Sequence, residues 1–138
     1  MMNEPVSTIM STDLVTLGPN DTLEKVRQLF SEKRIHHLPV VDDGNLVGLV
    51  TTYDLFKMGK AAHEYADIKV SEIMTKKLAR LEPSSKVGTA AEIFLENLFH
   101  ALPIVDGEKL VGIVTTFDIL RYEFKKEYPS SDHNALPG

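Results

Sequence analysis

Two copies of a short motif, Thr-Thr-aromatic-Asp, contain the residues best suited to binding chemistry. They run from Thr51 to Asp54 and from Thr115 to Asp118. Each copy follows an apolar run and precedes residues with helical spacing, so its carboxylate is expected near a helix N-terminus, where unpaired N–H groups and the helix dipole stabilise negative charge. A carboxylate in that place can also accept two hydrogen bonds from a vicinal diol. The motif therefore predicts either a plain helix cap or a ligand site.

Other chemistries find less support in the sequence. His36 and His37 are adjacent on an extended segment, so their side chains point to opposite faces and do not easily share a metal ion with His100. The chain has no cysteine, no nucleophile elbow and no Gly-Lys-Thr phosphate loop. Arg34 and Arg121 are interpreted as parts of weakly basic anion sites or as solvated surface charges. We therefore predict no metal site and no catalysis.

The elements that must position these motifs occur twice in the same order. Residues 6–56 and 70–120 align at a constant offset of 64 positions. Each copy predicts a helical turn, a short strand, an amphipathic helix, a hairpin of two apolar strands and a helix that follows the threonines. A unit of about 50 residues rarely buries enough apolar surface alone, so two units should pack about a pseudo-two-fold axis. The predicted fold class is α/β, with two tandem β-α-β-β-α repeats.

Boundaries follow from the same reading. The first repeat is expected over 1–60, a connector over 61–69, the second repeat over 70–128 and a disordered tail over 129–138. The short strands are expected at 14–17 and 78–81, the helix caps at Asp21 or Thr22 and at Ser84 or Ser85, and a helix is expected to continue beyond residue 57. Gly48 and Gly112 interrupt apolar strands, which indicates a bulge or a close approach, through packing more than through a ligand.

Composition limits the partners. The net charge of −5 argues against broad nucleic-acid or anionic-membrane binding, which needs a basic surplus. No apolar run approaches the length of a membrane span, and the N-terminus lacks the features of a signal peptide. These patterns predict a soluble cytoplasmic protein with no membrane and no nucleic-acid partner.

Together the motifs resemble the cystathionine β-synthase (CBS) domain. The resemblance lies in a Val-Ser-x-Ile-Met opening, a His-x-Leu-Pro-hydrophobic-Val-Asp strand and a Gly-hydrophobic-Val-Thr-x-x-Asp helix start, all repeated, and it covers roughly residues 5–125. Two such units make a CBS pair, or Bateman module, and this chain looks like a stand-alone pair. The resemblance implies regulatory binding of AMP, ADP, ATP or S-adenosylmethionine in clefts between the repeats, with no required cofactor. The regulated partner protein is not implied.

The resemblance also assigns ligand contacts. Asp54 and Asp118 would accept from ribose hydroxyls, and Thr51 and Thr115 would contact phosphate or ribose. The residue before Leu-Pro can reach phosphate, and it is His37 in the first repeat but Ala101 in the second. The adenine would be held from the opposite repeat, by Met74 to Leu78 and Phe99-His100 at the Asp54 cleft, and by Met10 to Leu14 and Ile35-His36 at the Asp118 cleft. Because Ala101 lacks a phosphate contact and Leu98 stands where the first repeat has Arg34, the Asp54 cleft is favoured if only one binds.

A homodimer is a further implication of the resemblance. The interface would be formed by apolar residues on the last helix of each repeat, which are Leu55, Phe56, Ile119 and Leu120. The alternative from a different class is a ligand-free structural or protein-interaction module, in which the two aspartates only cap helices.

Overall fold

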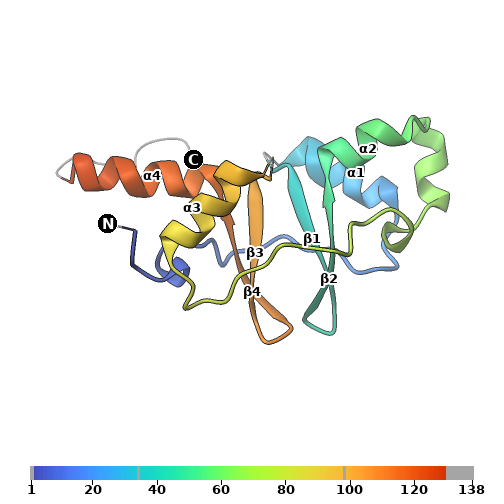
Figure 1. The fold of residues 1–138 in the computed structure, drawn as a ribbon. Coiled ribbons are helices and arrows are strands. Elements are labelled where there is room, and N and C mark those ends of the chain that lie inside the picture. Colours follow the sequence, from blue (N-terminus) through green and yellow to red (C-terminus); the bar gives the residue numbers. More distant parts are fainter. Residues whose placement is uncertain (1, 34, 98, 130–138) are drawn as a thin grey trace. The chain divides into compact units, whose positions relative to one another are not determined.

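The computed structural model describes residues 2–33, 35–97 and 99–129, and it divides into two compact units (Figure 1). Unit 2 contains residues 15–79 and 108–110, and unit 1 contains residues 2–14, 80–107 and 111–129. Both units combine helices with strands, so the predicted α/β class is confirmed. Arg34, Leu98 and residues 130–138 of the predicted tail lie outside the described residues.

Unit 2 is built on the first hairpin. Its elements are α1 (Leu23–Glu32), β1 (His37–Asp42), β2 (Asn45–Thr51), α2 (Thr52–Met58) and the 3₁₀ helices Ala62–Asp67 and Val70–Glu72. Strands β1 and β2 pair antiparallel, with His37 opposite Thr51 and Asp42 opposite Asn45. The two turn residues Asp43 and Gly44 have φ of 53° and 81°. Positive φ at both positions is the geometry of a type I′ turn, so the predicted hairpin is confirmed.

Unit 1 is built on the second hairpin. Its elements are the 3₁₀ helix Val6–Thr8, α3 (Val87–Glu96), β3 (Ala101–Asp106), β4 (Lys109–Thr115) and α4 (Thr116–Glu127), although the first residues of β4 lie with unit 2. Strands β3 and β4 are hydrogen-bonded neighbours. None of the helices in the described ranges has the length and apolar character needed to cross a membrane.

Each unit has its own apolar core. The helix residues with helical spacing, Leu23 and Val26 on α1 and Val87 and Ala90 on α3, are fully buried, as their one-sided stripes predict. In unit 2 they pack with Leu17, Leu38, Val40, Val50 and Val70, and in unit 1 with Val6, Leu102, Ile104 and Val114.

The short strands predicted at 14–17 and 78–81 are not formed in full; in each segment a single residue makes a β-bridge. Leu17 bridges Val40 in parallel, through hydrogen bonds to the backbone of Pro39 and Val41 at 2.9 and 2.8 Å. Extending this ladder would need a backbone N–H from Pro39 on one side and from Pro19 on the other, and proline has none. Leu81 bridges Ile104 in the same way, between Pro83 and Pro103. The prolines therefore stop both strands.

Two predicted helix ends were wrong. Helix α3 starts after Lys86 and not after Ser84 or Ser85, because the Ser85 hydroxyl accepts a hydrogen bond from the Glu82 N–H at 3.1 Å in the preceding turn. Helix α2 ends at Met58 and does not continue through the connector, because Gly59 adopts a left-handed φ of 65°. This is the usual way in which glycine terminates a helix.

The opening segment of each sequence repeat packs on the hairpin of the other repeat. In unit 1, Val6 is buried among α3, β3 and β4 residues, and Ser11 pairs with Ile113 of β4. In unit 2, Val70 is buried beside α1 and the first hairpin, and Thr75 pairs with Leu49 of β2. The compact units therefore differ from the sequence repeats, because residues 2–14 lie with the core of the second hairpin.

Two glycines allow this exchange. An added Cβ at Gly48 would lie 2.4 Å from Sδ and 3.0 Å from Cβ of Met74, and an added Cβ at Gly112 would lie 2.4 Å from Sδ of Met10. Both glycines are buried, so each methionine lies directly on a bare stretch of strand. The close approach expected at these glycines is thus a packing contact with the exchanged segment.

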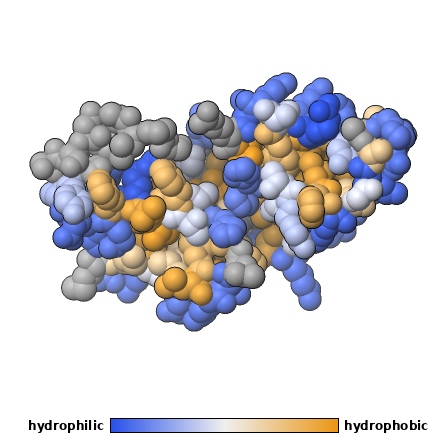
Figure 2. All heavy atoms as spheres, turned by 90° about the horizontal axis from the view of Figure 1, so that it is seen from above, coloured by the Kyte–Doolittle hydropathy of each residue, from blue (hydrophilic) through white to orange (hydrophobic). Residues whose placement is uncertain are grey.

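The four apolar residues predicted to form a dimer interface differ in how far they are exposed to solvent. Leu55 and Ile119 pack against the cores of their own units. By contrast, Phe56 is 82% and Leu120 is 66% exposed. Apolar side chains also reach the surface among hydrophilic ones on the face shown in Figure 2. The exposed apolar surface of α2 and α4 therefore includes Phe56 and Leu120 together with Tyr53, Phe117 and Phe124, and not Leu55 and Ile119.

We expect Gly48→Ala to lower the free energy of unfolding by about 1–3 kcal/mol, because overpacking at Met74 forces a shift of side chain or backbone. The measurement is the midpoint of urea unfolding. In a Met74→Ala background the same change should cost much less, because the overlapping atoms are gone. Gly18→Ala is the control, since its nearest atom would be 3.7 Å away. Equal losses with and without Met74 would contradict the contact.

Candidate functional site

The second Thr-Asp motif forms the N-terminus of α4. Thr115 is the N-cap residue, and its hydroxyl oxygen accepts from the Asp118 N–H at 3.3 Å. The Asp118 carboxylate accepts in return through Oδ2, from the Thr115 N–H at 2.8 Å and from the Thr115 hydroxyl at 3.1 Å. This reciprocal arrangement is a capping box, which satisfies two N–H groups that the helix leaves unpaired.

The first motif repeats this geometry at α2 with one difference. The Thr51 N–H donates to Oδ2 of Asp54 at 2.8 Å, and the Asp54 N–H donates to the Thr51 hydroxyl at 3.3 Å. Here the other carboxylate oxygen is also engaged, because Lys57 Nζ lies 3.6 Å from Oδ1 of Asp54. Asp54 is only 6% exposed, so this carboxylate is both covered and paired.

At Asp118 the second oxygen is left available. Within the described part of the chain, Oδ1 of Asp118 has no hydrogen-bond or ion-pair partner. Arg121 occupies the position that corresponds to Lys57, but its guanidinium lies over the Phe117 ring, 4.7 Å from the ring centre. The same motif therefore has an available acceptor, Oδ1 of Asp118, in unit 1, whereas the equivalent oxygen of Asp54 in unit 2 is in an ion pair with Lys57.

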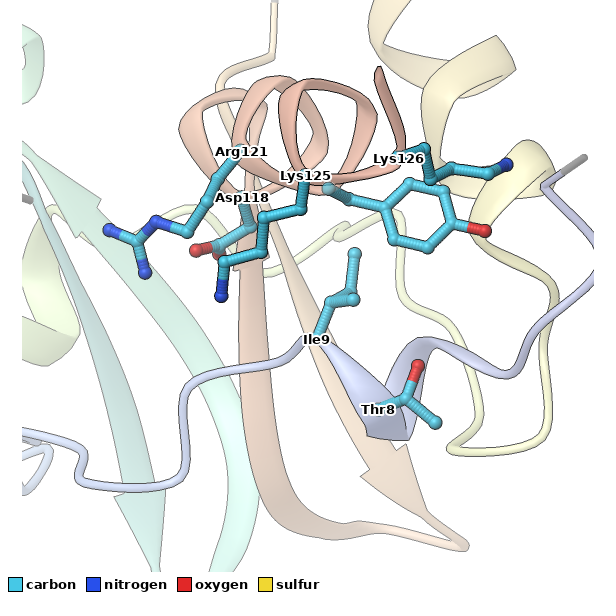
Figure 3. A pocket seen from close by; sticks show the side chains of 7 residues that line it. Thr8, Ile9, Asp118, Arg121, Lys125 and Lys126 are labelled. Carbon is cyan, nitrogen blue, oxygen red and sulfur yellow. The ribbon is translucent and has the colours of Figure 1, made fainter. Parts of the chain in front are cut away.

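A pocket of about 430 Å³ opens beside Asp118 (Figure 3), a size within the usual range of ligand pockets. Its lining comes from two parts of unit 1, which are Thr8 and Ile9 of the opening segment and five residues of α4. The α4 residues are Asp118, Arg121, Tyr122, Lys125 and Lys126. In Figure 3 the side chains of Asp118, Arg121 and Lys125 extend from the helix, with Ile9 beneath it.

The exchanged opening segment holds the far side of this pocket in place. Its backbone is fixed by hydrogen bonds of 2.9 and 3.0 Å between Ser11 and Ile113, and by a 2.7 Å bond from the Val6 N–H to the Ser85 carbonyl. The Thr8 hydroxyl donates to the Pro5 carbonyl at 2.7 Å, which keeps its lone pairs available. Pocket and fold thus depend on the same packing of residues 2–14.

A tyrosine joins the opening segment to α4 at the edge of the pocket. The Tyr122 hydroxyl donates to Oε2 of Glu4. Burial raises the pKa of Tyr122, and the bond to Glu4 raises it further, while the same bond lowers the pKa of the Glu4 carboxyl. The Tyr122 phenol therefore stays protonated, and Glu4 stays ionised, around neutral pH.

The other sequence-predicted site residues lie outside the lining of the described pocket. Met10 packs on Gly112 and Met74 on Gly48, and neither Met10 nor Leu14 is among the residues that line the described pocket. His36 and His100 are exposed, and their carbonyls accept from Thr52 and Thr116 at 3.2 and 3.1 Å, beside the motif of their own repeat. Leu78 and Ile35 are half-buried, Phe99 is exposed, and His37 is half-buried at the start of β1.

Sequence reasoning missed part of the pocket. It named Asp118 and Arg121, but not Thr8, Ile9, Tyr122, Lys125 or Lys126 as site residues. Helical spacing contained a signal for Arg121, Tyr122 and Lys125, which follow Asp118 at i+3, i+4 and i+7 and so share its face. Thr8 and Ile9 had no such signal, because their approach depends on the exchange of segments. In the described residues, no group of three His, Asp or Glu side chains gathers as a metal site would require.

Known proteins show the same pattern. The model of the CBS domain matches residues 6–60 and 70–125. Protein MJ0188 of Methanocaldococcus jannaschii is 31% identical over 138 residues, which are 98% of this chain and 50% of that protein. The chain therefore spans about half the length of this relative.

Two solved structures add ligands to the comparison. CBSX2 of Arabidopsis thaliana, in complex with AMP, matches with a TM-score of 0.80 and 30% identity, over 90% of this chain and 98% of that one. The CBS domain pair of MJ0100, in complex with 5′-methylthioadenosine and S-adenosyl-L-methionine, matches with a TM-score of 0.75 and 30% identity, over 88% and 97%. The two family matches each contain one Thr-Asp motif and together cover most of the sequence, and so this chain belongs to the CBS domain family as a tandem pair.

Proposed function

We propose that this CBS pair is a regulatory module that binds an adenosine-containing ligand, and that the pocket at Asp118 is a binding site. One observation carries the proposal: a carboxylate fixed through Oδ2 presents a free Oδ1 to a pocket lined by three basic side chains. The bound ligands of CBSX2 and MJ0100, which are AMP, 5′-methylthioadenosine and S-adenosyl-L-methionine, share the adenosine group and so support this ligand class.

The chemistry of ribose fits this site. A vicinal diol donates two hydrogen bonds, and a preoriented carboxylate accepts them, each charge-assisted bond contributing about 1.5–3 kcal/mol. Ile9 supplies an apolar surface for the base, and Thr8 supplies a hydroxyl whose lone pairs are available.

The sequence favoured the Asp54 side because of His37, whereas the geometry favours the Asp118 side. The Asp54 carboxylate has both oxygens engaged, by Thr51 and by Lys57. A ligand at Asp54 would first have to displace the lysine. We therefore propose Asp118 and Thr115 as the stronger site and Asp54 and Thr51 as a weaker one.

Binding at this pocket has a route to regulation. The ligand would contact the opening segment through Thr8 and Ile9 and helix α4 through Asp118, so it would stabilise the arrangement in which these two parts meet. A ligand shifts a conformational equilibrium only by its differential affinity for the states. This ligand would favour the state in which residues 2–14 are packed against the rest of unit 1.

The first expected outcome concerns stability. An adenosine ligand at 100 times its dissociation constant should raise the melting temperature by about 5–10 °C, since binding to the folded state alone adds about 2.7 kcal/mol. AMP, ADP, ATP and S-adenosylmethionine are tested separately by differential scanning fluorimetry. If none shifts the transition at millimolar concentration, the ligand-free interaction module becomes the better reading.

The two aspartates provide a matched pair for the site itself. Asp118→Ala and Asp54→Ala each remove one capping box, so both should destabilise a helix to a similar degree. Only Asp118→Ala should weaken ligand binding strongly, by about 1.5–3 kcal/mol for the lost charge-assisted bonds. Isothermal titration calorimetry on folded variants measures this. A larger loss at Asp54 would restore the ranking that the sequence favoured.

We also propose a homodimer through the exposed apolar residues of α2 and α4, since exposed apolar patches commonly mark interfaces. Leu120→Glu should then produce monomers with the fold intact, because this side chain is 66% exposed. Leu95→Glu, on α3 and 88% exposed, is the control that should leave the dimer unchanged. Light scattering reports the mass. A monomeric wild-type protein at micromolar concentration would refute this proposal.

A further inference from the structure

Basic side chains along α4 distinguish the Asp118 pocket from the corresponding part of the first repeat. Arg121, Lys125 and Lys126 line the pocket against the single carboxylate of Asp118, in a chain whose net charge is −5. In the first repeat α2 ends at Met58, and the positions that correspond to Lys125 and Lys126 are Ala61 and Ala62. The concentration of positive charge is therefore a property of the second repeat.

Two of these cations are available to a ligand. Within the described ranges, neither Arg121 nor Lys125 forms an ion pair with a carboxylate, and the contact of Arg121 is with the Phe117 ring. Lys126 differs, because its Nζ lies 3.8 Å from Oε1 of Glu123 and over the Tyr122 ring. The uncompensated charge of the pocket is therefore concentrated at Arg121 and Lys125.

The spacing of these residues on α4 places two cations near the Asp118 carboxylate. Arg121 and Lys125 follow Asp118 by three and seven residues, so their Cα atoms lie about 4.5 and 10 Å further along the helix axis on the same face, and their long side chains lean back toward the helix N-terminus. Figure 3 shows these side chains beside the Asp118 carboxylate. A ribose bound at Asp118 would thus have two cations within reach of its 5′ substituent, enough to contact more than one phosphate group.

We infer that this pocket selects adenosine ligands with two or three phosphates over AMP and over S-adenosylmethionine. The inference rests on the proposed function. Each additional phosphate adds negative charge and acceptor oxygens for Arg121 and Lys125, and guanidinium and ammonium groups bind phosphate by charge-assisted hydrogen bonds. S-adenosylmethionine has a sulfonium cation next to its ribose, which the same side chains repel.

The test is a calorimetric titration of the full chain with adenosine, AMP, ADP, ATP and S-adenosylmethionine in buffer with EDTA. We expect affinity to rise from AMP to ADP to ATP, by about tenfold or more overall. Lys125→Gln should lower the affinity for ATP about fivefold, the effect of one partly exposed charge pair, and should leave the affinity for adenosine unchanged. Lys25→Gln, which removes an exposed lysine that pairs with Asp21, is the control and should change neither.

The outcomes separate this inference from the proposed function. Equal affinities for AMP and ATP, or tighter binding of S-adenosylmethionine, would overturn the polyphosphate preference while the adenosine site stands. An unchanged ATP affinity in Lys125→Gln, with a far-ultraviolet circular dichroism spectrum like that of wild type, would also overturn it. Absence of binding by every adenosine compound would remove the proposed function and the inference together.

Discussion

The exchange of opening segments is the interaction on which the rest of the structure depends. Each segment buries one valine in the other repeat's core, pairs with that repeat's hairpin and lays a methionine on a bare glycine. Without residues 2–14, the hairpin of β3 and β4 would expose Gly112 and the core around Ile104, and the pocket at Asp118 would lose Thr8 and Ile9. Folding and ligand site therefore rest on the same contact.

The capping box gives each aspartate a structural role and a chemical one. One carboxylate oxygen satisfies the N-cap residue, so the orientation of the second oxygen is fixed before any ligand arrives. Preorientation of this kind reduces the entropy lost on binding. What differs between the repeats is the residue three positions on: Lys57 pairs with Asp54, whereas Arg121 lies over Phe117. The carboxylate of Asp54 is therefore occupied by an ion pair, whereas that of Asp118 remains accessible to a ligand.

Much of the fold could be predicted from the sequence because local patterns decide it. The helical stripes of α1 and α3, the Asp43-Gly44 turn and the threonine N-caps all follow from spacing and residue type. The short strands could not be predicted, because Pro19 and Pro39 act from different segments to end the Leu17 ladder. For the same reason, Thr8 and Ile9 could not be assigned to the site, since their place depends on tertiary packing. The lack of an ion pair at Arg121 and Lys125 among the described residues likewise depends on side-chain geometry that no spacing rule contains.

The proposed regulation depends on a nucleotide that binds at Asp118, between α4 and the opening segment. The most direct measurement is a crystal structure of the full chain grown with ATP. We expect ribose hydroxyls within hydrogen-bond distance of Oδ1 of Asp118, the base against Ile9, and the phosphates beside Arg121 and Lys125. Nucleotide density elsewhere in the chain, with Oδ1 of Asp118 left without a ribose contact, would contradict it.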